Sequence, residues 1–361
     1  MGGALRLGVV GVGNISTQYF ETLPRLSGLE LVAVADLDGA RASEVAAAQN
    51  VESRSVDDLL DSADLDVVLN LTIPAAHVEV SLRALAAGKH VYTEKPFGLS
   101  TASARALLEA QSEDLRIGSA PDTVLGTGVQ TARRALDDQL VGDPIGAAVH
   151  WSSAGHERWH PSPAFYYQPG GGPLFDMGPY YLTSLVTLFG PVSRVYGTAS
   201  RSSRTRRVAG GPIAGTVVPV EVDTHITAIL EHAGGVTSTV TVSFEVWATT
   251  APLFEVYGTE GTILMPDPNA FSDIASVWTT DQPDWIELPV SAGYRDAGRG
   301  VGLADMAAAI ANGTPHRASG ELGFHVLEIM ESILIASADH RVVPLASTVA
   351  RPTAVPLEDA N

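Results

Sequence analysis

The first candidate for a chemical role is a lysine that lies between an apolar run and a proline. Residues 92–98 read Tyr-Thr-Glu-Lys-Pro-Phe-Gly, so Lys95 lies just beyond a predicted strand. A side chain at the carboxyl end of a parallel strand points into the crevice where open α/β sheets bind ligands. Lysines at strand ends are more often solvated charges, and this heptapeptide alone leaves both interpretations open.

A carboxylate and a phenol four residues apart form the second candidate. Asp176 and Tyr180 lie in residues 174–182, which follow Pro-Gly-Gly-Gly-Pro and run into a predicted helix. Residues four apart share one face of a helix, so both side chains would meet one substrate. The alternative is an N-cap aspartate beside an ordinary packing tyrosine, and the spacing does not decide between them.

A glycine-rich turn near the N-terminus indicates a dinucleotide site. Residues 5–10 predict a strand, residues 11–16 read Gly-Val-Gly-Asn-Ile-Ser, and a predicted helix follows. Gly11 permits the tight turn, and Gly13 lets the backbone approach a pyrophosphate at the helix N-terminus. Ser16 replaces the third glycine of this fingerprint and is still small enough for close helix packing.

An acid after the second predicted strand supports the same interpretation. Residues 29–35 are apolar and end at Asp36, whose carboxylate would accept hydrogen bonds from the adenosine ribose. The same charge would repel a 2′-phosphate, which favours NAD over NADP, although Arg41 nearby softens that preference. The alternative is that Asp36 caps the helix beginning near Gly39.

Strands and helices continue to alternate up to residue 120, which predicts a doubly wound parallel sheet of about six strands. The expected helices are 40–48, 56–60, 75–87 and 101–110, and the further strands are 65–71, 89–92 and 115–120. His77 lies in the first turn of its helix. We expect a packing or cofactor contact there rather than a metal ligand, because no second ligand stands at helical spacing.

A second domain is predicted after Pro121-Asp122. Residues 220–231 and 236–246 alternate between apolar and polar side chains, which predicts an antiparallel hairpin with one apolar face. Its threonine-rich outer face is either exposed to solvent or packed against a sister subunit. The expected boundaries are 1–122 for the first domain, 123–345 for the second and 346–361 for a polar, loose tail.

Composition excludes several classes of protein. At 361 residues the chain is long enough for two domains, and its net charge of −19 argues against a nucleic-acid or anionic-membrane partner. The basic cluster at 201–207 is expected to be a solvated loop. The absence of cysteine excludes disulfides and thiol chemistry. Without a secretory signal or an apolar run of about 18 residues, we expect a soluble cytoplasmic protein.

Three motifs together resemble the Gfo/Idh/MocA oxidoreductase family, in the family's order and over nearly the whole chain. They are the turn at 11–16, Glu94-Lys95-Pro96, and residues 170–178, which read Gly-Gly-Gly-Pro-Leu-Phe-Asp-Met-Gly. The Glu-Lys-Pro and Asp-x-Gly elements are the more diagnostic ones. The resemblance implies an N-terminal Rossmann NAD(P)-binding domain and a C-terminal α/β domain. The second domain's large, open, mostly antiparallel sheet often forms the interface of a homo-oligomer, here a dimer or tetramer.

The resemblance also implies hydride transfer between nicotinamide and a carbon of a sugar, inositol or related polyol. Lys95 would hydrogen-bond the reacting oxygen, and Asp176 would orient or assist the acid–base group. Tyr180 stands where many members carry histidine, although glucose-fructose oxidoreductase and some sugar ketoreductases resemble this chain in having tyrosine there. We expect Tyr180 to remove the hydroxyl proton, helped by Lys95 and Asp176. The help is needed because an unperturbed phenol titrates near 10, and a nearby cation lowers that pKa.

The expected site residues fall into two sets, and no metal is expected. The NAD (or NADP) contacts are Gly11, Gly13, Asn14, Ile15, Asp36, Thr72, Pro74, His77, Glu94 and Lys95. The substrate contacts, an aromatic and polar mixture, are Trp151, His156, Trp159 and His160. Two other functions stay open: a non-catalytic dinucleotide- or sugar-sensing regulator of the same fold, and a reductase of a non-sugar substrate such as a dihydrodiol. The presence of both Lys95 and Asp176 argues against the sensor.

Overall fold

The computed structural model describes residues 3–112 and 114–360. Residues 1, 2, 113 and 361, which fall in the expected first domain and tail, lie outside the described residues. The chain forms two compact units. The first contains the residues up to Thr127 together with Ala292–Phe324 and Val355 onward, and the second contains Gly128–Ser291 and His325–Ala354.

A parallel sheet of six strands organises the first unit, as predicted. Its strand order is β3-β2-β1-β4-β5-β6, so the order reverses between β1 and β4. The strands are β1 (Leu5–Val10), β2 (Leu29–Ala35), β3 (Glu52–Arg54), β4 (Val67–Asn70), β5 (His90–Thr93) and β6 (Ile117–Ser119). Aliphatic side chains such as Val9, Val34 and Leu69 are fully buried in it. Ligands of such folds bind at this reversal, outside the carboxyl ends of the strands.

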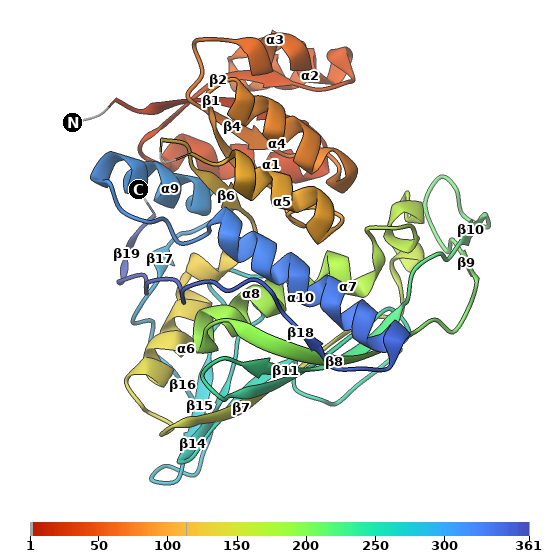
Figure 1. Ribbon diagram of the computed structural model, residues 1–361, viewed down its shortest axis with the longest axis vertical. Helices are drawn as coiled ribbons and strands as arrows, with labels where there is room; N and C mark the ends of the chain where they lie inside the picture. The colour runs from red at the N-terminus through yellow and green to blue at the C-terminus, as the bar shows by residue number, and fades with distance from the viewer. Residues whose placement is uncertain (1–2, 113, 361) are drawn as a thin grey trace. The chain divides into compact units, whose positions relative to one another are not determined.

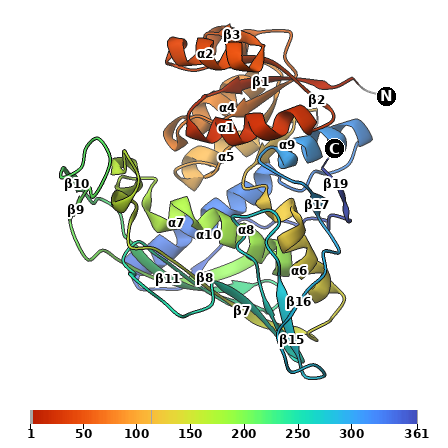
Figure 2. The same ribbon diagram turned by 180° about the vertical axis from the view of Figure 1, so that it is seen from behind.

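Helices cover both faces of this sheet. Figure 1 shows α4 and α5 in front of it, and Figure 2, from behind, shows α1 on the other face. The helical segments are α1 (Asn14–Thr22), η1 (Leu23–Arg25), α2 (Gly39–Gln49), α3 (Val56–Asp61), η2 (Pro74–Ala76), α4 (His77–Ala86), α5 (Thr101–Ala110), η3 (Thr123–Leu125) and α9 (Val301–Asn312). The helices α2, α3 and α5 begin at side-chain caps, namely Asp38, Ser55 and Ser100. Short polar side chains of this kind satisfy the first backbone N–H groups of a helix.

The first unit also holds segments from the end of the chain. The buried carboxylate of Asp122 accepts hydrogen bonds from the backbone N–H groups of Gly300 and Gly302, at 2.8 and 3.1 Å. Strand β17 (Tyr294–Arg295) pairs in parallel with β19 (Glu358–Asp359), and Val355 is buried. The expectation of a loose tail is therefore wrong, because backbone pairing and an apolar anchor hold it.

A nine-stranded mixed sheet organises the second unit, with the order β16-β15-β14-β13-β7-β12-β11-β8-β18. All neighbouring strands are antiparallel except β7 and β12, which are parallel. The strands are β7 (Pro144–Ser152), β8 (Val192–Ser200), β11 (His225–His232), β12 (Thr237–Ser243), β13 (Phe254–Gly258), β14 (Gly261–Leu264), β15 (Ser276–Thr279), β16 (Ile286–Glu287) and β18 (Val343–Pro344). A separate ribbon joins β9 (Thr205–Arg207) to β10 (Val217–Pro219).

One face of the nine-stranded sheet carries the helices of its unit. Figures 1 and 2 both show α8 lying along it, together with α6 and the second half of α10. The helical segments are α6 (Thr127–Asp137), η4 (His156–Arg158), η5 (Ala164–Tyr167), α7 (Gly172–Asp176), α8 (Gly178–Phe189) and α10 (Gly320–Asp339). No helix in the described part of the chain is long and apolar enough to cross a membrane.

The predicted hairpin is confirmed as β11 and β12. Ile226 pairs with Val242 and Ala228 with Val240, and all four side chains are buried. The other face carries Ile229, which is 43% exposed, and the exposed threonines 237 and 239. The alternation thus predicted both the pairing and the buried face, because side chains of a strand point to opposite sides in turn.

Candidate functional site

The glycine-rich turn joins β1 to α1 and fits a pyrophosphate. Gly11 has a φ of +91°, and a Cβ atom on it would lie 2.7 Å from the carbonyl of Leu71, so only glycine is accommodated. A Cβ on Gly13 would meet nothing within 4 Å. Helix α1 begins at Asn14 without a side-chain cap, so its first backbone N–H groups, at Asn14 and Ile15, are available to an anion.

The carboxylate of Asp36 is anchored beside this turn. Its Oδ2 accepts a hydrogen bond from the N–H of Val12 at 2.9 Å, and its Oδ1 accepts one from the N–H of Asp38, also at 2.9 Å. The residue that caps α2 is Asp38, whose side chain accepts from the N–H groups of Ala40 and Arg41. The alternative interpretation of Asp36 as that cap is therefore wrong.

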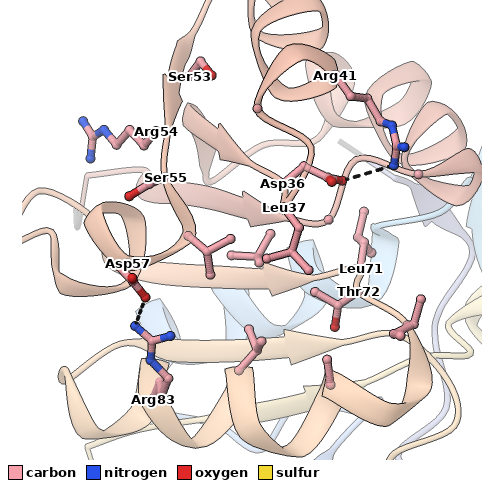
Figure 3. Close-up of a pocket in the computed structure, with 18 of the residues that line it drawn as sticks. Asp36, Leu37, Arg41, Ser53, Arg54, Ser55, Asp57, Leu71, Thr72 and Arg83 are labelled. Atoms are coloured by element: carbon pink, nitrogen blue, oxygen red, sulfur yellow. Dashed lines mark hydrogen bonds and ion pairs between the residues drawn. The ribbon is translucent and has the colours of Figure 1, made fainter.

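A cavity of about 840 Å³ opens at the carboxyl ends of β1, β2 and β4, all within the first unit. Figure 3 shows Asp36 and Leu37, which follow β2, and Leu71 and Thr72, which follow β4, on its walls. Leu37 is 97% exposed and Ile73 is 70% exposed, so two apolar side chains flank the space beyond Asp36. The glycine turn, the acid and these apolar walls fit the pyrophosphate, ribose and adenine of NAD.

Lys95 follows β5, and Glu94 fixes its backbone. The carboxylate of Glu94 turns into the unit, where its Oε2 accepts from the N–H of Lys95 at 2.8 Å and its Oε1 from the hydroxyl of Tyr19 at 2.9 Å. Burial, followed by the charge of Glu94, raises the pKa of Tyr19 well above its usual range, so this hydroxyl stays a donor. Glu94 is buried, whereas Lys95 is half-buried.

Thr72 and His77 link the ends of β4 and β5. The hydroxyl of Thr72 donates to Oδ1 of Asn70 at 2.6 Å, and His77 places Nε2 2.9 Å from the carbonyl oxygen of Thr72 and Nδ1 2.8 Å from that of Pro96. Burial lowers the pKa of His77. Pro74 begins η2, just before this histidine. No group of three or more potential metal ligands occurs among the described residues.

Asp176 and Tyr180 do not share one helix, so this expectation is wrong. Asp176 is the last residue of α7, Met177 separates the two helices, and Tyr180 lies in the first turn of α8. Pro179 explains the break, because in a continuous helix its ring would clash with the carbonyl of Phe175 and its missing N–H would leave that carbonyl unpaired. Tyr180 is buried, and its N–H donates to the carbonyl of Met177.

A histidine from another segment meets Asp176. Nε2 of His156 lies 2.9 Å from Oδ2 of Asp176, and the two side chains are 8% and 15% exposed. Rings of Trp151, Trp159 and Tyr166 pack around the imidazole. The four residues expected at the substrate, Trp151, His156, Trp159 and His160, therefore lie in one cluster of rings.

Hydrogen bonds and ion pairs that are mostly shielded from solvent adjoin this cluster. The hydroxyl of Tyr167 donates to Glu157 and accepts from the N–H of His156. Arg206 pairs with Glu157 at 3.3 Å and with Glu245 at 2.6 Å, and its side chain is only 14% exposed. The basic segment 201–207 is thus not simply a solvated loop, because Arg206 pairs with the buried Glu157 and the half-buried Glu245.

Sequence reasoning missed several residues of these sites. Tyr166 lies in the aromatic run Phe165-Tyr166-Tyr167, a composition signal that would have indicated it. Phe244 also contacts His156, with ring centroids 4.5 Å apart. It follows β12 and reads as an ordinary strand residue, so the sequence carries no signal for this role.

Family models and solved structures extend these observations. Residues 5–118 match the model of the oxidoreductase family with an NAD-binding Rossmann fold, and residues 129–264 match the Gfo/Idh/MocA C-terminal domain. The trans-1,2-dihydrobenzene-1,2-diol dehydrogenase of Bos taurus is 30% identical over 271 residues, which is 73% of this chain and 75% of that protein. Inositol 2-dehydrogenase 3 of Saccharopolyspora erythraea is 37% identical over 110 residues, covering 30% of this chain and 32% of its own.

Among solved structures, levoglucosan dehydrogenase in its apo form has a similar fold, with a TM-score of 0.83 at 20% identity over 96% of this chain and 100% of its own. The chain belongs to the Gfo/Idh/MocA oxidoreductase family. It is an NAD-dependent dehydrogenase, and the residues that match the NAD-binding Rossmann fold, 5–118, lie within the first unit.

Proposed function

We propose that this dehydrogenase oxidises a secondary alcohol on a ring, in a sugar, an inositol or a related cyclic polyol. The hydride of the C–H bond passes to C4 of the nicotinamide, and the hydroxyl proton passes to a protein base. In the reverse direction the same groups return a hydride and a proton to a ketone. Each oxidation thus consumes one NAD⁺ and yields one ketone, one NADH and one proton.

The observation that carries the proposal is the placement of Lys95. It follows β5, the second strand beyond the switch of strand order, in the same unit as the glycine turn and Asp36. Glu94 fixes its backbone N–H. A cationic donor held in this way stabilises the negative charge that develops on the substrate oxygen as its proton leaves.

The second unit supplies the acid–base groups of the proposal. Tyr180, acting as its phenolate, accepts the hydroxyl proton and becomes a phenol, and Asp176, bonded to His156, assists it. The rings of Trp151, Trp159 and His160 line the substrate position, since aromatic faces suit the C–H faces of a cyclic polyol. We propose cofactor contacts for Gly11, Gly13, Asn14, Ile15, Asp36, Thr72, Pro74, His77, Glu94 and Lys95.

A second substrate class is favoured by the bovine relative, which is named for a trans-dihydrodiol of benzene and matches most of this chain. An apolar ring bearing two vicinal hydroxyls would also suit a pocket rich in aromatic side chains. The chemistry at the oxidised carbon is the same in both classes. They differ in whether the far side of the ring carries hydroxyls or an apolar edge.

Absorbance at 340 nm tests both classes in one assay. Purified protein with NAD⁺ or NADP⁺ is offered levoglucosan, inositols, common hexoses and trans-1,2-dihydrobenzene-1,2-diol. Reduction of NAD⁺ by a cyclic polyol supports the proposal, and reduction by the dihydrodiol alone assigns the second class. If no compound is oxidised, while sugars still tighten NAD binding, the polyol dehydrogenase assignment is wrong.

We also propose that the bare face of the nine-stranded sheet joins two or four copies of this chain. Ile229 and Tyr196 pair across β11 and β8 and are 43% and 38% exposed. Threonines flank them on β12. Light scattering after gel filtration should give a dimer or tetramer, and Ile229→Asp should lower the mass toward that of one chain. A monomeric parent protein would contradict this.

A further inference from the structure

We propose that His156 is a positioning residue, which holds the Asp176 carboxylate in one orientation and affects the reaction through it. This inference deepens the proposed function and rests on it, because Asp176 there assists proton transfer. It also revises the simpler expectation that His156 only lines the substrate pocket.

The contact between the two side chains is at hydrogen-bond distance and is largely shielded from solvent. Nε2 of His156 and Oδ2 of Asp176 are 2.9 Å apart, and the side chains are 8% and 15% exposed. A carboxylate oxygen accepts, so the proton of this bond belongs to Nε2. Hydrogen bonds to a charged group are stronger than neutral ones, and more so where little water competes. The bond therefore restricts rotation of the carboxylate.

The other ring nitrogen shows that packing alone does not explain the histidine. Nδ1 of His156 is buried and has no hydrogen-bond partner among the described residues. A buried polar atom without a partner destabilises the folded state, whether or not it carries a proton. Phenylalanine would fill this space without that cost. The bond to Asp176 is what histidine adds here.

Neighbouring groups fix the plane of the imidazole. The ring of Tyr166 stands perpendicular to it at 4.3 Å between centroids, Phe244 lies at 4.5 Å and Trp159 at 5.0 Å. The backbone N–H of His156 donates to the hydroxyl of Tyr167 at 3.1 Å. Because ring and backbone are both held, the direction of the Nε2–H bond is fixed before any substrate arrives.

Three variants separate positioning from pocket lining. His156→Phe keeps the ring and removes the donor, and His156→Gln restores a donor without the ring. His160→Phe is the matched control, because His160 packs on the same Tyr166 while its Nδ1 accepts from the N–H of Ser162. We expect His156→Phe to lower kcat roughly tenfold or more with KM within about threefold, and His156→Gln to recover much of that loss. His160→Phe should change KM rather than kcat.

A spectroscopic measurement distinguishes this inference from the proposed function. The Nε2 proton of an imidazole bonded to a carboxylate gives a slowly exchanging, downfield proton resonance. We expect such a resonance in the parent protein and its loss in both Asp176→Asn and His156→Phe. If the resonance is present but no substrate reduces NAD⁺, only the proposed function fails. A missing resonance, or a His156→Phe enzyme with kcat within twofold of the parent, overturns the positioning role.

Discussion

Asp36 and Asp38 stand two residues apart and have different tasks. Asp36 holds the N–H of Val12 beside the glycine turn, whereas Asp38 caps α2. Only Asp36 was singled out from the sequence, although Asp38 also follows the strand. Spacing alone does not say which one caps the helix, because the cap depends on the backbone angles that bring a side chain back to the first turn.

The pair gives a matched test of cofactor recognition. Asp36→Asn keeps an acceptor for Val12 but loses the charge that recognises the ribose and repels a 2′-phosphate. We expect the Kd of NAD to rise roughly tenfold, because a hydrogen bond to a charged group is lost. The Kd of NADP should fall, because the repulsion of its 2′-phosphate is removed. Fluorescence titration with both dinucleotides measures this.

Asp38→Ala is the control for this test. It should cost about 1 kcal/mol of unfolding free energy through the lost cap and leave the Kd of NAD within about twofold. Equal losses of affinity in the Asp36 and Asp38 variants would show that the loop, and not the Asp36 charge, is what matters.

At the scale of elements, long regular segments were predictable and breaks were not. Helix α5 spans the predicted residues 101–110, and β1 and β2 also have the predicted bounds. The predicted single helix through Asp176 breaks at Met177, two residues before Pro179, although proline is a strong signal against a helix interior. The His156 contact with Asp176 joins segments twenty residues apart, and no local spacing indicates such a pair.

His77 connects two elements, and its removal should affect both stability and turnover. It contacts the carbonyl oxygens of Thr72, after β4, and Pro96, next to Lys95. Because burial lowers the pKa of His77, the neutral ring donates to only one of these carbonyl oxygens. His77→Phe removes that buried hydrogen bond, which costs about 1–3 kcal/mol, and frees the Lys95 segment. We expect a lower urea midpoint and a kcat reduced roughly tenfold.

His316→Phe is the comparison for His77, because this buried histidine contacts the carbonyl oxygen of Ile117 in the same unit. It should lose stability and keep kcat. If both variants lose kcat in proportion to their loss of stability, His77 supports the unit as a whole and not the Lys95 segment in particular.

At the scale of the whole molecule, the hydrophobic pattern predicted the two architectures but not the path of the chain between them. The residues Ala292–Phe324 lie in sequence between the two segments of the second unit, yet they pack in the first. The buried carboxylate of Asp122 accepts hydrogen bonds from the N–H groups of Gly300 and Gly302, which are 178 and 180 residues away in sequence. Periodicity reports which face is buried, and it does not report which distant segment covers it.

Buried histidines make stability depend on pH. His325 in the second unit accepts from the N–H of Val192, and burial lowers its pKa to about 4. An unfolded histidine titrates near 6.5, so the unfolded state binds the proton first as pH falls. Stability is complete above about pH 6.5 and is lost toward pH 4, by about 3 kcal/mol from this residue.

His325→Gln tests that pH dependence, because its amide oxygen accepts from Val192 without titrating. Urea unfolding at pH 7 and at pH 4.5 should show a smaller loss of stability in the variant than in the parent protein. The same loss in both would assign the acid sensitivity to other groups, such as the buried His232, whose pKa is also lowered by burial.

The central claim is that Tyr180, helped by Lys95 and Asp176, removes the hydroxyl proton. The chain contains only two lysines, Lys89 and Lys95, so Lys89→Ala is a natural control. The decisive measurement is kcat at 340 nm for Lys95→Ala and Tyr180→Phe on the best substrate. We predict losses of about 10²-fold or more, as is usual for acid–base groups, with NAD affinity retained in Tyr180→Phe. If both variants turn over within about tenfold of the parent enzyme, the account is wrong.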